Sequence, residues 1–177
     1  MAISHHPPIA VLGIDPGSQC LGWGIVREQS GVLTLVACGT VRPKGNDFSA
    51  RLGNLFVQLA DIVCLHKPDE AAVENVFTHK NILSALKLGQ ARGAAIAACA
   101  AHGVPVTDYE PTLIKKTLVG NGRAEKTQVA YMVSQLLGKK ADWALDTTDA
   151  LGAAICHLNM RRLTRLSSPV GRKTVTI

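Results

Sequence analysis

The stretch Ile9-Ala-Val-Leu-Gly-Ile-Asp-Pro-Gly-Ser-Gln-Cys-Leu-Gly-Trp-Gly-Ile-Val26 decides the fold of this chain. Residues 9–14 form an apolar run that is too short for a helix, which predicts a strand buried on both faces. The strand ends at Asp15, a Pro-Gly-Ser turn follows, and residues 21–26 return as a second strand. Two glycines of that second strand leave room beside the carboxylate for another backbone or a ligand. Asp15 therefore suits a cation and the phosphate that it carries, with a purely turn-forming role as the alternative.

The composition indicates one domain in a reducing compartment. The chain has 177 residues, of which 47% are hydrophobic, enough for a single core. Its five cysteines are widely spaced and include no Cys-x-x-Cys pair, so we expect free thiols rather than disulfides or a zinc site. We expect neither a membrane span of about 20 apolar residues nor a signal peptide, and hence a cytoplasmic protein with no membrane partner.

The formal net charge of +6 is unevenly distributed. Residues 115–140 contain one acid, Glu125, and six basic residues: Lys115, Lys116, Arg123, Lys126, Lys139 and Lys140. Residues 161–177 contain five basic residues and no acid. Clustered positive charge favours a polyanion, with nucleic acid the first candidate and an anionic membrane the second. A solvated basic surface without a partner is the alternative.

Turn residues and hydrophobic periodicity divide the rest of the chain into strands and helices. We expect a third antiparallel strand at residues 32–42, an amphipathic helix at 49–66 capped by Asn46 or Asp47, a short strand at 71–74, a long helix at 81–101, a fifth strand at 104–109, and helices beginning at 111, 124 and 147. The long helix has a face of small residues that lets another helix approach, by default within the same fold. We expect residues 1–8 to be an N-terminal extension, 9–163 one domain, and 164–177 a basic, disordered tail.

Four of the thirteen acids stand out by position. Asp15 and Glu74 each end an apolar strand, whereas Asp146 and Asp149 are three residues apart at a helix start and share a face of that helix. Taken singly, Asp146 is a good helix cap, and acids in a first turn favour the helix dipole. Clustered carboxylates repel one another unless cations neutralise them, and their oxygens suit Mg²⁺ or Mn²⁺. With the basic segments, the four acids indicate metal-assisted phosphoryl transfer on nucleic acid.

From residue 9 to about residue 160 the sequence resembles the RuvC family of crossover junction endodeoxyribonucleases. The matching stretches occur in the family's order and spacing: Gly13-Ile-Asp-Pro-Gly-Ser18, Gly22-Trp-Gly24, Val73-Glu-Asn-Val-Phe77, Ser84-Ala-Leu-Lys-Leu-Gly-Gln-Ala-Arg-Gly93, Val119-Gly120, Ala124-Glu-Lys126 and Asp146-Thr-Thr-Asp-Ala-Leu151. The first stretch alone is weak, because actin-like ATPases also place Asp-x-Gly on a first hairpin. The resemblance covers neither the first eight residues nor the basic tail.

The resemblance implies a ribonuclease H-like α/β fold, in which a five-stranded mixed sheet of order 3-2-1-4-5 is flanked by helices. Residues 9–163 would be the nuclease domain, with Lys126 as a catalytic cation and four catalytic, metal-binding carboxylates: Asp15, Glu74, Asp146 and Asp149. The implied DNA contacts are Phe77, Lys80, Lys115, Lys116, Arg123 and Lys126. By the family match, Phe77 stacks on bases or wedges between them. The motif leaves open whether Lys115 or Lys116 is the lysine at the site.

The activity implied by the resemblance is resolution of four-way (Holliday) DNA junctions by paired symmetric nicks, in homologous recombination and DNA repair. Two Mg²⁺ ions per site, for which Mn²⁺ substitutes, would support phosphodiester hydrolysis that leaves 5′-phosphate and 3′-hydroxyl ends. The implied partners are the junction DNA, a second copy of the chain in a two-fold dimer, and the branch-migration motor complex RuvA-RuvB. The implied location is the bacterial cytoplasm, at the nucleoid.

Two other functions fit parts of the sequence. One half of an actin-like ATPase or sugar kinase shares the Asp-x-Gly hairpin, but 177 residues leave little room for the second half that closes over a nucleotide. A junction-binding module without catalysis is the second alternative. The four acids argue against it, because concentrated negative charge beside phosphate weakens DNA binding.

Overall fold

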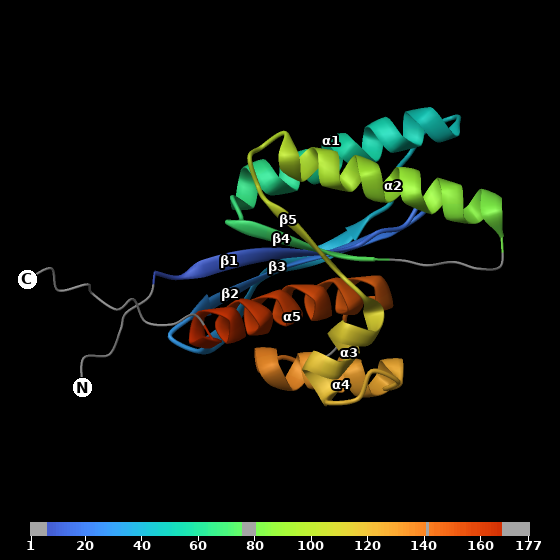
Figure 1. Cartoon of the computed structure of the whole chain (residues 1–177). Helices are drawn as coiled ribbons and strands as arrows, with labels where there is room; N and C mark the ends of the chain where they lie inside the picture. Colours follow the sequence, from blue (N-terminus) through green and yellow to red (C-terminus); the bar gives the residue numbers. More distant parts are fainter. Residues whose placement is uncertain (1–6, 76–80, 141, 168–177) are drawn as a thin grey trace, which may run out of the picture.

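The computed structural model describes residues 7–75, 81–140 and 142–167, which form a five-stranded sheet with helices on both faces (Figure 1). Phe77 and Lys80, singled out from the sequence, lie outside the described residues. In chain order the elements are β1 (Ile9–Asp15), β2 (Leu21–Gln29), β3 (Val32–Val41), α1 (Phe48–His66), β4 (Glu70–Glu74), α2 (Ile82–Ala100), β5 (Val106–Tyr109), α3 (Pro111–Val119), α4 (Lys126–Leu137) and α5 (Leu145–Ser167).

The strand order is β3-β2-β1-β4-β5, which confirms the predicted ribonuclease H-like sheet. β1 pairs antiparallel with β2 and parallel with β4, and β4 pairs parallel with β5. Because β1 is central and covered on both faces, its residues Val11, Leu12 and Ile14 are fully buried. The parallel pairing of β1 with β4 brings the carboxyl ends of both strands to the same edge of the sheet.

Helices α1 and α2 cover one face of the sheet, and α5 covers the other, with α3 and α4 packed beyond it (Figure 1). Ala91, Ala95 and Ala98 of α2 are fully buried in the core that α2 shares with α1. The small-residue face of α2 therefore packs within the fold, as expected. The N-cap of α1 is Asp47, whose Oδ1 accepts a hydrogen bond from the Ala50 amide at 2.7 Å.

Helix α1 corrects one expectation, because it is long and apolar enough to cross a membrane by length and composition. Its mean hydropathy is 1.3 over the most apolar window. In this fold α1 is one layer of the domain, with Leu55, Leu59 and Val63 packed into the core against the sheet. The charged Asp61 lies on its exposed side. The sequence pattern predicted this amphipathic packing but not the high overall hydropathy.

Helix α5 exceeds its predicted bounds at both ends. It starts at Leu145, and the Thr148 amide already donates to the carbonyl of Ala144, so Asp146 lies in the first turn and is not the cap. It also runs to Ser167, so the expected domain boundary at residue 163 falls inside the helix. Exposed polar side chains do not end a helix while its backbone hydrogen bonds continue, and the Thr164 hydroxyl also donates to the Met160 carbonyl within this last stretch.

The far half of α5 is tied to the sheet by a partly buried contact with the carboxylate of Glu70. His157 Nε2 lies 2.6 Å from Glu70 Oε2 at the start of β4, and Arg161 contacts the same carboxylate. The other ring nitrogen of His157 lies 3.0 Å from the Tyr109 hydroxyl on β5. These contacts hold the far half of α5 against β4 and β5.

Candidate active site

Two of the predicted acids come from the ends of adjacent parallel strands. Ile14 of β1 is in register with Val73 of β4, so Asp15 and Glu74 leave the sheet side by side. Parallel strands place such residues at one edge, where loops and helix starts can complete a site. The first turns of α1, α2 and α5 lie at this same end of the sheet, on the right in Figure 1.

The other two acids are brought to this edge because glycines let α5 lie directly on β1 and β2. A Cβ atom at Gly13 would lie 1.8 Å from the carbonyl oxygen of Ala150, and one at Gly22 would lie 1.9 Å from that of Asp146. Any side chain at either position would push the helix away. Of the two glycines of β2 beside Asp15, Gly22 therefore admits a backbone, which is one of the two possibilities left open by the sequence, whereas Gly24 admits the side chain of Leu151.

The first turn of α5 also contacts β3 and the turn after β1. The hydroxyl of Thr147 donates to the carbonyl of Gly39 at 3.0 Å. Burial, together with a hydrogen bond to Asp146, raises the pKa of the Cys20 thiol, and the nearby guanidinium of Arg42 opposes this rise. The sequence reading missed Cys20 and Arg42. One feature of the sequence could have located Arg42. The expected pairing of the second and third strands places the residue that follows the third strand beside the turn that contains Cys20.

Burial and mutual repulsion raise the pKa values of the two strand-end acids, Asp15 and Glu74. Burial raises the pKa of Asp15 to about 8, and the charges of Glu74, Asp149 and Asp146 add to this rise. Burial raises the pKa of Glu74 to about 7, with a further contribution from Asp149, whereas Lys126 and Lys115 act in the opposite direction. The four acids therefore lie close enough to influence one another. A divalent cation would offset the repulsion between their negative charges and so favour the ionised form of all four.

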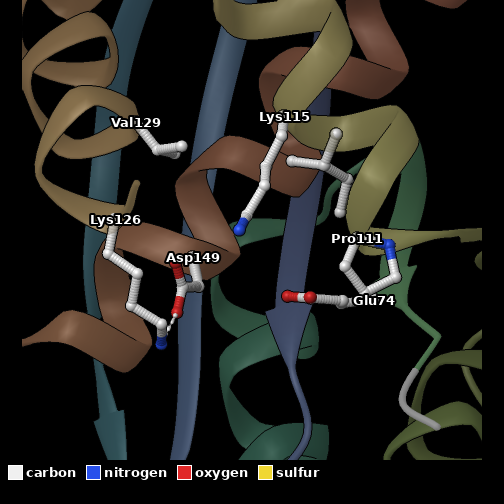
Figure 2. A pocket seen from close by; sticks show the side chains of 7 residues that line it. Glu74, Pro111, Lys115, Lys126, Val129 and Asp149 are labelled. Carbon is white, nitrogen blue, oxygen red and sulfur yellow. Dashed lines mark hydrogen bonds and ion pairs between the residues drawn. The ribbon is translucent and has the colours of Figure 1, made fainter. Parts of the chain in front are cut away.

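Two lysines border a cavity of about 230 Å³ between Glu74 and Asp149. Lys126 Nζ donates to Asp149 Oδ2 at 3.1 Å, and the side chains of Lys115 and Glu74 extend into the space beside this pair (Figure 2). The hydrogen bond to Asp149 raises the pKa of Lys126, which keeps this lysine protonated. Lys115 and Lys126 thus place positive charge where a phosphate beside the acids would lie.

The structure separates the remaining cations from this cavity. Lys116 lines a different groove, between α3 and α5, so Lys115 is the lysine that faces the acids. Arg123 is exposed in the turn before α4 and is not among the residues that line the cavity. The roles expected for Phe77 and Lys80 fall outside the described residues.

The donor set suits a hard divalent cation, although the side chains are not arranged as a closed ligand cage. Within residues 7–75, 81–140 and 142–167, no three acidic, histidine or cysteine side chains are gathered closely enough to hold an ion. Asp149 instead pairs with Lys126. Four carboxylates from three elements, two of them with strongly raised pKa values, nevertheless provide the oxygen ligands that Mg²⁺ and Mn²⁺ prefer.

Comparison with known proteins identifies the family to which this arrangement belongs. The family model described as crossover junction endodeoxyribonuclease RuvC matches residues 11–157. The chain belongs to the RuvC family. A RuvC family protein of Nitratidesulfovibrio vulgaris is 71% identical over 159 residues, a match that covers 90% of this chain and 96% of that protein. A second, from Oleidesulfovibrio alaskensis, is 69% identical over 160 residues, with the same coverage of both chains.

Solved RuvC structures share the fold described above. The structure of Thermus thermophilus RuvC in complex with Holliday junction substrate superposes with a TM-score of 0.83 at 33% identity, and the match covers 88% of this chain and 96% of that one. The yeast mitochondrial Holliday junction resolvase Ydc2 superposes with a TM-score of 0.69 at 14% identity, which shows a shared fold alone. The RuvC match spans β1 to α5 and so includes all the elements that carry the four acids.

Proposed function

We propose that this chain is a crossover junction endodeoxyribonuclease that resolves four-way (Holliday) DNA junctions by paired symmetric nicks, in homologous recombination and DNA repair. The observation that carries the proposal is the grouping of Asp15, Glu74, Asp146 and Asp149 at one edge of the sheet, with two lysines beside them. Membership of the RuvC family supports it, since the relatives carry that enzyme name and one RuvC structure contains the junction.

The four carboxylates would hold the metal, which we propose to be two Mg²⁺ ions per site, with Mn²⁺ as a substitute. When bound, such ions activate a water molecule for attack on phosphorus and stabilise the leaving oxygen. Lys126 and Lys115 would bind the scissile phosphate and offset its developing negative charge. The nick would leave 5′-phosphate and 3′-hydroxyl ends.

Further DNA contacts are proposed for the cations around the site. Lys116, Arg123 and Lys80 would contact phosphates away from the cut, and Phe77 would stack on bases or wedge between them near the crossover. Exposed Arg123 lies in the turn that precedes Lys126, which supports a contact close to the site. The tail after α5 would add sequence-independent affinity through its basic residues.

We further propose that two copies assemble as a two-fold dimer. The start of α2 supports this, because Ile82, Leu83 and Leu86 are 87%, 69% and 58% exposed and form an apolar patch on its first turns. An isologous dimer presents two equivalent sites to the two like strands of a junction. The branch-migration complex RuvA-RuvB would be a further partner, in the cytoplasm at the nucleoid of a bacterium.

The test is cleavage, with Mg²⁺, of a mobile four-way junction compared with linear duplex, single-stranded DNA and an RNA–DNA hybrid. We expect paired nicks in the junction and little cleavage of the other three substrates. Asp15→Asn is the control for contaminating nucleases, and ligation of the products checks the end chemistry. Equal cleavage of duplex and junction, or binding without any cleavage, would refute the proposal.

A further inference from the structure

A second group of cations lies on the opposite face of the sheet from Lys115 and Lys126. Its members come from the loop after β3 and from the first two turns of α1 and α2, at the sheet edge that carries the acids. We call it the α1–α2 basic surface, and it consists of Arg42, Lys44, Arg51 and Lys87. The N-cap of α2 is the neutral Asn81 and no acid occurs in its first turn, so the positive end of this helix dipole adds to the charge.

Two of these cations converge on one aromatic ring. The guanidinium carbon of Arg51 lies 5.7 Å from the centre of the Phe48 ring, and Lys87 Nζ lies 5.8 Å from it. Arg51 belongs to α1 and Lys87 to α2, so the pair forms only when the helices pack. Cation–π contacts hold the two side chains near each other despite their like charges. The result is a preformed concentration of positive charge.

This charge is not neutralised by the chain itself. In the described part of the chain, no acid lies within ion-pair distance of Arg51 or Lys87, and the buried Nε of Arg51 has no hydrogen-bond partner. The carboxylate of Asp47 accepts a hydrogen bond from the Ala50 amide and forms no ion pair with Arg51 or Lys87. By contrast Arg92, further along α2, pairs with Asp108 at 2.5 Å. Unpaired cations held close together are suited to an external anion.

The α1–α2 basic surface is continuous with the carboxylate site. Arg42 directly follows Val41, which pairs with Leu21 of β2, and the next residue of β2, Gly22, lies against the carbonyl of Asp146. The loop after Arg42 folds onto α1, where the Lys44 amide donates to Asn54 Oδ1 at 2.8 Å. Cations therefore lead from the acids over the start of α1 to α2, in the direction away from Lys115 and Lys126.

We propose that the α1–α2 basic surface binds the phosphate backbone of one duplex arm as that arm leaves the cleavage site. DNA fits better than an acidic protein segment, because the cations extend from the carboxylate site itself, where the proposed substrate is cut. This proposal rests on the proposed junction substrate and adds to it a second contact track. Lys115 and Lys126 would hold the cut strand on one face of the sheet, and the new surface would hold an arm on the other.

The test compares the wild type, the double variant Arg51→Ala/Lys87→Ala, and the control Arg27→Ala, which removes an exposed cation at the far end of β2. Junction binding is measured by fluorescence anisotropy without divalent metal, over a range of salt. The plot of log K against log salt has a negative slope, and each lost phosphate contact makes it less steep by about 0.9. We therefore expect the slope of the double variant to be less steep by about 1.8 and that of the control to be unchanged. Thermal unfolding confirms that all three are folded.

Trimming the junction arms stepwise then locates the contact. The difference between wild type and double variant should vanish once the arms are too short to reach α2. An unchanged salt slope, or a difference that persists with the shortest arms, would overturn the arm contact. Failure of the wild type to prefer a junction over duplex would instead refute the proposed function, so the two failures are distinguishable.

Discussion

Substituting Gly22 by alanine should damage the site without touching a catalytic group. The new Cβ would lie 1.9 Å from the carbonyl oxygen of Asp146 and 2.2 Å from its carbonyl carbon. Carbon and oxygen repel strongly below about 3.0 Å, so the first turn of α5 must move by about 1 Å. A displacement of about 1 Å at reacting groups costs roughly 100-fold in rate, and an overpacked core costs about 1–3 kcal/mol of stability.

The assay is single-turnover junction cleavage with Mg²⁺, alongside urea unfolding of the same preparations. The control is Gly53→Ala in α1, where a Cβ meets nothing within 4 Å and alanine should raise the free energy of unfolding by about 0.5–1 kcal/mol. Junction binding should survive in both variants. If Gly22→Ala cleaves as fast as Gly53→Ala and is equally stable, α5 does not depend on Gly22 for its position, and the reasoning is refuted.

Four further outcomes are expected. Each of Asp15→Asn, Glu74→Gln, Asp146→Asn and Asp149→Asn should abolish cleavage while preserving junction binding in gel-shift assays; normal turnover in two of them would contradict the site. Mg²⁺ or Mn²⁺ should restore cleavage to chelated protein and Ca²⁺ should not, whereas activity in EDTA would exclude metal dependence. In metal-free protein the folded-state pKa of Asp15, about 8, exceeds its unfolded value of 3.8, so the free energy of unfolding should fall as pH rises between these values, and Asp15→Asn should flatten that slope in urea titrations. Phe77→Ala should reduce cleavage strongly with an almost unchanged melting temperature, because a wedge is exposed; a loss of about 3–5 kcal/mol in stability would place the ring in the core.

The ends of the strands were predictable because they are local features. An apolar run, then an acid, then turn residues located Asp15 and Glu74 from the sequence, and the strand order followed from the family resemblance. The role of the glycines was not predictable in the same way. Gly22 was consistent with a ligand or a backbone, and only the packing of α5 shows that the carbonyl of Asp146 occupies the space.

Helix phase and tertiary neighbours explain what sequence reasoning left open. The side chains of Lys115 and Lys116 leave α3 in directions about 100° apart, and only the packing of α3 against α5 shows which lysine faces the acids. Arg42, Arg51 and Lys87 are far apart in the chain and carry no motif. These residues come together only because α1 packs against α2, and the distribution of charge along the sequence does not reveal that packing.

The packing of α5 on β1 and β2 has a consequence for biosynthesis. The first half of the proposed metal site, Asp15 and Glu74, emerges from the ribosome long before Asp146 and Asp149. Gly13 and Gly22 stay uncovered until α5 has been synthesised, so the four acids can come together only after residues 145–167 are available. A product of interrupted translation that lacks α5 carries only two of the four acids. The enzyme therefore acquires its capacity to cut DNA only after α5 has been synthesised and has packed on the sheet.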